Sequence, residues 1–217
     1  DAGKITFNDN VISGDFGIEN SKLKNIDILD NHLHQSFSCK NTDAQDFKFN
    51  NNKLSGSWET DLVKLAHLSM NDNIFKEKLS ITSSSTRNLT LYDNTIKSDF
   101  EIINTTSTNI ILGDNQFSKK CYISQSGCND LKVFTNHFKL DFELFNIRTK
   151  DIIFNHNHFS KNIQLSYPDS EDFIFSENTA QHIIVTRGNF AEISITECQE
   201  TGRLTLYKVD CSKGLII

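Results

Sequence analysis

Several residue types that tight turns, membrane spans and nucleic-acid sites rely on are scarce in this sequence. Its 217 residues include one proline and nine glycines, which is too few to supply the many tight turns of a hairpin-rich all-β protein. No apolar segment approaches the roughly 20 residues of a membrane-spanning helix. No run of lysine or arginine occurs and the net charge is -6, so the sequence predicts no nucleic-acid binding and disfavours anionic partners.

Asparagine, by contrast, recurs with a strict period of 21 residues. A repeat of this length indicates a solenoid in which each repeat forms one coil. We therefore interpret residues 1–217 as a single repeat domain that is a segment of a longer chain. The repeated asparagines are Asn10, Asn31, Asn52, Asn73, Asn94, Asn115, Asn136, Asn157 and Asn178.

Apolar residues fall at fixed offsets from each repeated asparagine: +2, +6, +8, +16 and +18. Alternation by two is typical of an extended strand with one side chain facing in and the next facing out. The pattern predicts an all-β fold with three short strands per coil. The repeat that follows Asn178 is one residue shorter than the others, which places Cys198 in the asparagine position.

An asparagine that faces the core costs about 1–3 kcal/mol if its amide lacks partners. Stacked coils supply these partners, because each amide can bond the asparagines above and below it and the nearby backbone. We therefore predict an internal Asn ladder, the column of the nine repeated asparagines, that also fixes the register of the coils.

The segment Asp130–Phe138, DLKVFTNHF, resembles the repeat of the pectate-lyase-like superfamily of parallel β-helices. The resemblance implies a right-handed, single-stranded parallel β-helix of about ten coils. That superfamily includes polysaccharide lyases and hydrolases as well as non-catalytic modules, so the resemblance bears on fold more than on activity. The leucine-rich repeat is the rival, because Leu23, Asn31 and Leu33 match part of its pattern.

Two polar columns predict turns. Asp or Asn precedes most ladder asparagines, as in Asp93 and Asp114, where a turn explains the column and a Ca²⁺ site is the alternative. Asp or Asn also recurs at offset +15, as in Asn25 and Asp46, and predicts the turn into the third strand.

An acidic group on the second strand is the candidate catalytic site. Asp99 and Glu101 flank an inward residue, so their side chains lie on one face roughly 6.5 Å apart, near the lower end of the spacing in inverting glycosidases. Asp141 and Glu143 repeat the pair two coils later. A solvated acidic face is the alternative, and strict 21-residue spacing leaves no insertion for cleft walls.

Two further groups are candidate binding sites. Three imidazoles and a carboxylate in neighbouring columns could hold Zn²⁺, with surface histidines in turns as the alternative. Three outward isoleucines and one outward tyrosine could bind a partner, because an exposed apolar strip is a common docking surface. The metal candidates are His137, His156, His158 and Glu177, and the binding candidates are Ile111, Ile153, Ile174 and Tyr122.

The five cysteines are predicted to be free thiols. Cys39 and Cys121 face inward four coils apart, as do Cys128 and Cys211 in another column, far beyond the roughly 7 Å that a disulfide can bridge. Free thiols favour a reducing compartment and hence a cytoplasmic location, with a secreted or cell-surface location as the alternative.

Neither end of the sequence offers a polar cap, since Ile5 and Phe7 at the start and Leu215 and Ile217 at the finish match strand positions. Flanking sequence or end-to-end self-association is therefore expected to cover at least one end.

The sequence favours a non-catalytic module that binds a protein or glycan on a sheet face, or that serves as a structural spacer. The alternative is a carbohydrate-active enzyme that uses the acidic group above. No phosphate-binding loop or nucleophile motif occurs, and we expect no cofactor.

Overall fold

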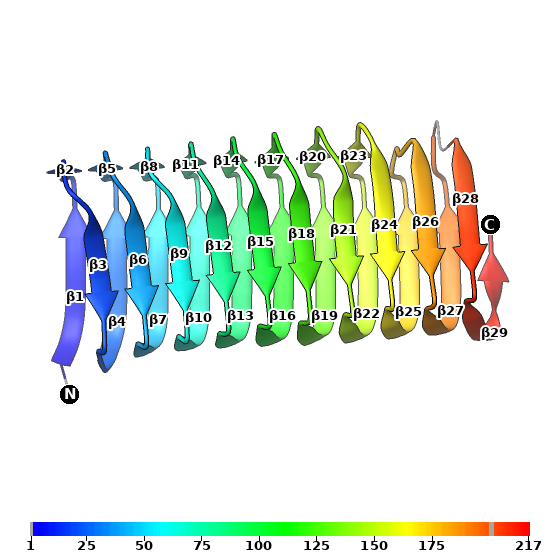
Figure 1. The fold of residues 1–217 in the computed structure, drawn as a ribbon, viewed down its shortest axis with the longest axis horizontal. Helices are drawn as coiled ribbons and strands as arrows, with labels where there is room; N and C mark the ends of the chain where they lie inside the picture. The colour runs from blue at the N-terminus through cyan, green and yellow to red at the C-terminus, as the bar shows by residue number, and fades with distance from the viewer. Residues whose placement is uncertain (1, 200–201) are drawn as a thin grey trace.

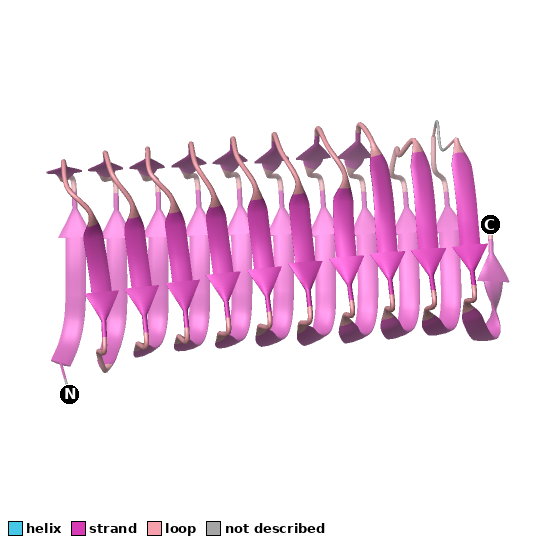
Figure 2. Ribbon diagram, viewed as in Figure 1, coloured by secondary structure: helices cyan, strands magenta, loops and turns pink. Residues whose placement is uncertain are grey.

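The computed structural model describes residues 2–199 and 202–217, and this part of the chain contains strands and turns without a helix (Figures 1 and 2). It follows that no helix among these residues could cross a membrane. The strands form three sheets in which every pairing is parallel, and each strand pairs with the equivalent strand of the next coil. The chain is therefore a parallel β-solenoid of about ten turns, as the sequence predicts, and the leucine-rich repeat is excluded.

Sheet A, the longest, contains the third strand of each coil. Its strands are β1 (Ala2–Asn8), β4 (Leu23–Leu29), β7 (Asp43–Asn50), β10 (Lys64–Asn71), β13 (Ser85–Tyr92), β16 (Thr106–Gly113), β19 (Gly127–Phe134), β22 (Arg148–Asn155), β25 (Asp169–Ser176), β27 (Asn189–Thr196) and β29 (Asp210–Ile216).

Sheet B contains the first strand of each coil, which is two residues long. Its strands are β2 (Val11–Ile12), β5 (His32–Leu33), β8 (Lys53–Leu54), β11 (Ile74–Phe75), β14 (Thr95–Ile96), β17 (Gln116–Phe117), β20 (His137–Phe138) and β23 (His158–Phe159).

Sheet C contains the second strand. Its strands are β3 (Phe16–Glu19), β6 (Phe37–Lys40), β9 (Trp58–Asp61), β12 (Leu79–Thr82), β15 (Phe100–Ile103), β18 (Cys121–Ser124), β21 (Phe142–Phe145), β24 (Asn162–Ser166), β26 (His182–Thr186) and β28 (Arg203–Tyr207).

The path of the chain is right-handed. From the N-terminus the chain ascends in the back layer through β1, crosses to the front at β2, descends in β3 and returns at the bottom to β4 while advancing to the right (Figure 1). Most crossovers between parallel strands have this hand, because right-handed strand twist favours it.

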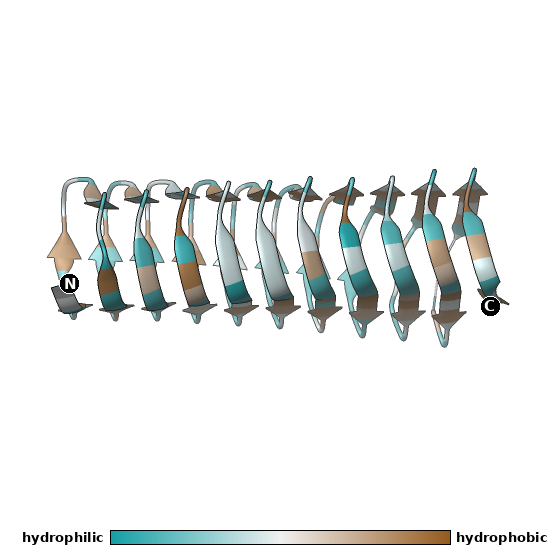
Figure 3. Cartoon of the chain, turned by 90° about the horizontal axis from the view of Figure 1, so that it is seen from below, coloured by the Kyte–Doolittle hydropathy of each residue, from teal (hydrophilic) through white to brown (hydrophobic). Residues whose placement is uncertain are grey.

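The core is the stack of inward apolar columns. Phe47, Phe100 and Phe142, from the second and third strands, have no exposed surface, and Trp58 stacks on Phe37 with ring centroids 4.2 Å apart. The strands of sheets A and C carry hydrophilic residues next to these hydrophobic ones (Figure 3), as the period of two requires. The core is thus continuous along the rod.

The Asn ladder is present along the whole predicted register. From Asn10 to Asn157, each Nδ2 donates to Oδ1 of the asparagine in the next coil at 2.9–3.3 Å. The same Oδ1 also accepts a backbone N–H, as that of Asn136 does from Asn115 at 2.9 Å. The eight asparagines from Asn31 to Asn178 are at most 3% exposed, so their amides are satisfied inside the protein.

Cys198 ends the ladder, as the shortened last repeat predicts. Its Sγ donates to the carbonyl oxygens of Phe175 at 3.5 Å and Thr196 at 3.3 Å, in the place where earlier coils use an asparagine amide. His182 pairs with Asn162 at a separation of 20, whereas the preceding pairing of Phe142 with Ile163 has a separation of 21. The missing residue therefore belongs to the corner before β26.

Residues with left-handed backbone form turns at two positions in each coil. Asp93 and Asp114 have φ of 55° and 54°, which supports the turn interpretation of the column before the ladder. The prediction of a turn at offset +15 is wrong, because Asn25 and Asp46 lie inside β4 and β7. The turn comes five residues earlier, at Asn20 and its equivalents, where φ is again positive. In the middle coils the +15 side chains instead bond one another along the outer face of sheet A, where Asn88 Nδ2 lies 2.9 Å from His67 Nδ1 and Asn109 Nδ2 donates to Asn88 Oδ1 at 2.7 Å.

All five cysteines are free thiols, as predicted. Burial raises the pKa of the Cys39 thiol to about 12 and that of Cys128 to about 11, and it raises the pKa of Cys121 well above its ordinary value. These thiols behave as small apolar groups in the core.

The end coils have a neighbour on one side only, so their inward side chains are less covered. Phe7 and Phe16 are half-buried at one end, and Leu206 and Leu215 are 37% and 44% exposed at the other. The cover expected for these coils stays a prediction.

Candidate functional site

The four candidate catalytic carboxylates lie along the outer face of sheet C. Glu101 and Glu143 point outward from β15 and β21, and Tyr122 of β18 lies between them in the register. Asp99 and Asp141 lie just before the same strands. Because successive coils are about 4.8 Å apart, the two glutamates are roughly 10 Å apart along the rod.

Each of these carboxylates has its own partner on an adjacent coil. Glu101 accepts from Lys78 Nζ at 2.6 Å, and Glu143 accepts from Lys120 Nζ at 2.8 Å. The hydrogen bond to Glu143 raises the pKa of Lys120, and the negative charges of Glu143 and Asp141 add to it. The two glutamates are thus engaged with lysines and do not face each other across a shared point.

The two aspartates cap turns. Asp99 Oδ1 accepts the backbone N–H of Lys120 at 3.2 Å, and Asp141 Oδ1 accepts that of Asn162 at 3.0 Å. Asp15 makes the same bond to Ser36 at 3.0 Å in the first coil, far from the candidate group. The repetition indicates that aspartate at this offset has a structural role in joining coils.

Tyr122 is partly covered on the same face. Lys120 Nζ lies 5.0 Å from the centre of its ring, within the range of a cation–π contact. The tyrosine is half-buried between the side chains of the adjacent strands. The sequence prediction places Tyr122 correctly on the outer face, beside the glutamates.

The four metal candidates divide into two pairs. His137 and His158 stack on adjacent coils with ring centroids 4.7 Å apart, whereas His156 Nε2 lies 2.7 Å from Glu177 Oε2. His158 Nδ1 is also within 2.7 Å of Thr179 Oγ1. Among the described residues, no group of three or more His, Cys, Asp or Glu side chains has an arrangement that could hold a metal ion. The zinc hypothesis therefore gains no support from the geometry.

The surroundings of His137 also disfavour its charged form. Partial burial lowers the pKa of its imidazole, and the nearby positive charges of His158 and Lys139 lower it further. His32, at the same offset near the N-terminus, has a pKa lowered by the same kinds of cause, with His34 and Lys53 among the nearby cations. Both of these imidazoles of sheet B thus lie close to lysine side chains.

The three candidate isoleucines lie on the outer face of sheet A, but they do not form an unbroken strip. In the register, Lys132 lies between Ile111 and Ile153, and Ile174 follows Ile153. All three isoleucines are half-buried. The apolar surface that they offer is smaller than the sequence suggests.

A glycine on this face accommodates two aromatic rings, which the sequence prediction missed. Tyr92 and Phe134 flank Gly113 on either side in the register, and their ring centroids are 5.7 Å apart. A Cβ on Gly113 would lie 2.5 Å from Tyr92 and 2.7 Å from Phe134. Aromatic residues one repeat before and one repeat after a glycine are the signal that could have predicted this cluster.

A stack of carboxylates runs beside the isoleucines. Asp130, Asp151 and Asp172 are direct neighbours in the register, followed by Glu192. Burial raises the pKa of Asp151, Lys150 opposes this shift, and the charges of Asp130 and Asp172 add to it. The outer face of sheet A therefore combines half-buried apolar residues with an acidic edge.

A row of lysines beside sheet B was also missed. Five successive coils each place one lysine three or four residues after the ladder asparagine. These residues, which we call the lysine row, are Lys76, Lys97, Lys119, Lys139 and Lys161. The recurrence of one lysine per repeat could have predicted this row, but no short stretch of the sequence contains a cluster of lysines.

Comparison of the chain with protein-family models, with curated proteins and with solved structures found no match.

Proposed function

We propose that this chain is a non-catalytic β-solenoid module that binds a partner on its sheet faces or holds other parts of an assembly apart. The observation that carries the proposal is the separate engagement of the candidate carboxylates, with Glu101 and Glu143 paired to lysines and Asp99 bonded to backbone. A general acid and base must both reach the substrate. Carboxylates held by different partners in different coils are poorly arranged for that task.

The regularity of the coils supports the same proposal. Strands of sheet C repeat from β3 to β24 once per coil without an insertion, and a two-residue strand of sheet B precedes each of them. Sugar-cleaving sites need walls that hold the substrate in place. Flat, repeated faces suit an extended partner, because equivalent positions recur along the rod.

We also propose the pectate-lyase-like superfamily as the relative of this solenoid. The right-handed path, the three parallel sheets and the ladder of Asn31 and its equivalents are what the resemblance implies for the fold. The binding partner under this proposal is a protein or a glycan.

The second candidate function is a carbohydrate-active enzyme. One observation favours it. Glu101, Tyr122 and Glu143 lie on three adjacent strands of sheet C, so an aromatic ring lies between two carboxylates. Retaining and inverting glycosidases both use a pair of carboxylates.

Incubation with a panel of acidic and neutral polysaccharides, followed by measurement of new reducing or unsaturated ends, distinguishes the two functions. We expect no cleavage by the protein or by the variant Glu101→Gln/Glu143→Gln. Cleavage by the wild type that this variant abolishes would overturn the non-catalytic proposal. Glu59→Gln is the control for loss of an ion pair, because Glu59 lies in the same column and is likewise paired with a lysine, at 2.8 Å.

A further inference from the structure

Stacking of the coils brings together five lysines that lie about one repeat apart in sequence. The side chains of the lysine row (Lys76, Lys97, Lys119, Lys139 and Lys161) are all exposed. None of the five forms an ion pair with another described residue, whereas Lys78 and Lys120, one or two positions further on, are paired with glutamates. The lysine row therefore offers uncompensated positive charge.

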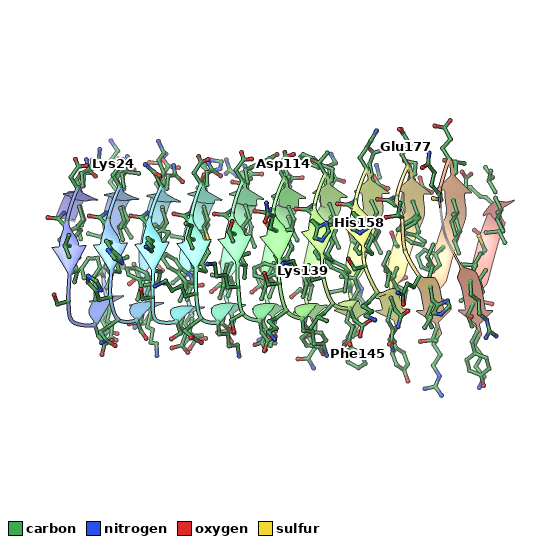
Figure 4. The ribbon with its side chains drawn as sticks, turned by 90° about the horizontal axis from the view of Figure 1, so that it is seen from above. Lys24, Asp114, Lys139, Phe145, His158 and Glu177 are labelled. Carbon is green, nitrogen blue, oxygen red and sulfur yellow. The ribbon has the colours of Figure 1, made fainter. Side chains whose placement is uncertain are left out.

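The row follows the rod, because its backbone continues the parallel ladder of sheet B at Lys76, Lys97 and Lys139, and at the serines that precede Lys119 and Lys161. Lys97 donates its backbone N–H to Phe75 at 2.9 Å, and Lys139 donates to Phe117 at 3.0 Å. With about 4.8 Å between coils, five successive coils cover roughly 19 Å along the rod. Lys139 and His158 lie in the middle of the face seen from above (Figure 4), with the outward residues of sheet B.

Carboxylates border parts of the row on both sides. Asp72, Asp93 and Asp114 are exposed in the turn column before the ladder, and Asp114 lies along one margin of the face in Figure 4. On the other side, Asp99 and Asp141 alternate with Lys78 and Lys120, whose charges are paired with glutamates. A bilayer or a nucleic-acid duplex laid on this face would meet these carboxylates, whereas a slender chain can follow the lysines and avoid them.

The composition of the row favours carboxylate over phosphate or sulfate. All five cations are lysine, which lacks the planar fork with which arginine binds phosphate and sulfate groups at two points. The other outward residues of these coils, at offsets +1, +3 and +4, include no Phe, Tyr or Trp on which bases could stack. Glu77 is the one acidic residue among them.

We propose that the lysine row binds an acidic segment of a protein partner, and this inference rests on the proposed function as a binding module. A helical segment fits the spacing best, because a helix advances about 5.4 Å per turn and can present one carboxylate to each coil. An extended segment presents side chains to one face only at intervals of about 6.7 Å, which is twice the rise per residue of a strand. About 13 helical residues cover the row.

The test uses the fluorescence anisotropy of labelled poly-L-glutamate, titrated with the protein at low ionic strength. In one variant the five lysines of the row become glutamine (K76Q/K97Q/K119Q/K139Q/K161Q). The control variant makes the same change in net charge at five exposed lysines elsewhere (K22Q/K24Q/K48Q/K64Q/K150Q). Circular dichroism and the emission of Trp58, which is fully buried, verify that both variants fold.

We expect the first variant to bind poly-L-glutamate at least about 10-fold more weakly than the wild type, as removal of five ion pairs implies. The control variant should lose less than about 3-fold, because none of its five lysines belongs to the row and only the general effect of net charge remains. An equal loss in both variants, or no binding by the wild type, would overturn the proposal.

Two parallel titrations, with polyuridylate and with polygalacturonate, test the assignment to a polypeptide. Tighter binding of either one that depends on the lysine row would replace the acidic protein segment by that polymer. Failure of all three polymers to bind would remove this inference and leave the module proposal in place, since that proposal depends on the absence of cleavage. Cleavage of polygalacturonate would refute the module proposal without deciding what the lysines bind.

Discussion

At the scale of single residues, Asn115 shows why an amide can occupy the core. Its Nδ2 donates to Asn136 Oδ1 at 3.0 Å and to the carbonyl oxygen of Leu91 at 2.9 Å. Its Oδ1 accepts from the backbone and the side chain of Asn94 at 3.0 and 2.9 Å. No donor or acceptor of this side chain lacks a partner.

Replacement of Asn115 by leucine should lower the free energy of unfolding by about 1–3 kcal/mol, because amide and backbone groups of the adjacent coils lose their partners inside the core. Urea denaturation followed by Trp58 emission measures the change. Asn129→Leu, at an exposed position of β19, is the control and should stay within about 0.5 kcal/mol of the wild type. Equal stability of the two variants would contradict the role of the ladder.

Gly113 allows a second prediction at this scale. Gly113→Ala should destabilise by about 1–3 kcal/mol, since the new methyl group must displace the rings of Tyr92 and Phe134. Gly127→Ala is the matched control, because the nearest atom to its Cβ is a carbonyl oxygen at an ordinary 3.6 Å. There we expect no loss, or a gain of up to about 1 kcal/mol, because alanine restricts the unfolded chain. Differential scanning calorimetry distinguishes the two, and a similar melting temperature for both would refute the explanation.

The ladder was predictable from sequence because one residue type repeats without interruption. A second buried polar column was missed because its occupants vary. At offset +11 from the ladder position, hydroxyl side chains such as Thr42 and Ser126 bond carbonyl oxygens two residues earlier, at 3.0 and 2.7 Å, while Val63 and Ile147 occupy the same column elsewhere. Because the residue type in this column changes from coil to coil, no single residue type repeats there, and the column cannot be detected from one sequence.

At the scale of the strands, sheet A carries a stack of like charges that sheet C avoids by pairing. Asp151 of β22 lies between Asp130 of β19 and Asp172 of β25 in the register. Like charges directly opposite one another on neighbouring strands are destabilising. Burial and these neighbours raise the pKa of Asp151, so its ionised form is disfavoured in the folded state.

Asp151→Asn should therefore stabilise the protein at pH 7, by about 0.2–1 kcal/mol. A carboxyl with a raised pKa in the folded state stabilises most below its unfolded pKa, ordinarily 3.8, and loses that contribution as the pH rises through its folded value. The advantage of the variant should therefore vanish at pH 3. Asp169→Asn, which removes a carboxylate 3.4 Å from Arg148, is the control and should give no gain at either pH. Chemical denaturation at both pH values is the measurement, and a gain independent of pH would contradict the charge explanation.

The strands were predictable from sequence where alternation is strict. Period-two columns correctly predicted three strands per coil, but they did not show that the third strand begins near offset +12, as β7 does at Asp43. The early part of this strand contains polar residues such as Gln45, which give no apolar alternation. The column at offset +15 was misinterpreted because Asn and Asp suit turns and outward side-chain stacks equally well.

At the scale of the whole molecule, the solenoid should tolerate loss of one coil but not of part of one. Deletion of residues 89–109 joins Asn88 to Ile110 and removes one complete repeat, so every inward side chain keeps its face. Deletion of residues 89–108 stops one position short of a repeat and places Asn109 in the inward column of Leu89. A slip of one residue moves the strand's apolar residues to the outer face.

We expect the first deletion to unfold cooperatively, with a urea m-value reduced by about one tenth in line with the shorter chain. The second should be severely destabilised or fail to fold. Circular dichroism and urea titration measure both, and cooperative unfolding of both deletions at the same midpoint would contradict the importance of register.

The lysine row shows what a linear inspection of the sequence misses. Its members are contributed singly by different coils, so the chain contains no basic run, and the net charge of -6 points away from anionic ligands. Stacking converts positions about one repeat apart into neighbouring positions. The catalytic hypothesis depended on local spacing, but the partner that each side chain bonds is set by the coil above or below. The pairing of Glu101 with Lys78 is an example.

The Asn ladder also has a direction. From Asn10 to Asn157, each Nδ2 donates one hydrogen bond to the asparagine of the next coil, and each of these asparagine oxygens accepts from the coil before it. The second hydrogen bond of Nδ2 goes to a backbone carbonyl, as that of Asn115 does to Leu91. Hydrogen bonds in such a chain polarise one another. The bonds between ladder side chains thus all run the same way along the rod, which makes the N-terminal and C-terminal ends of the ladder chemically distinct.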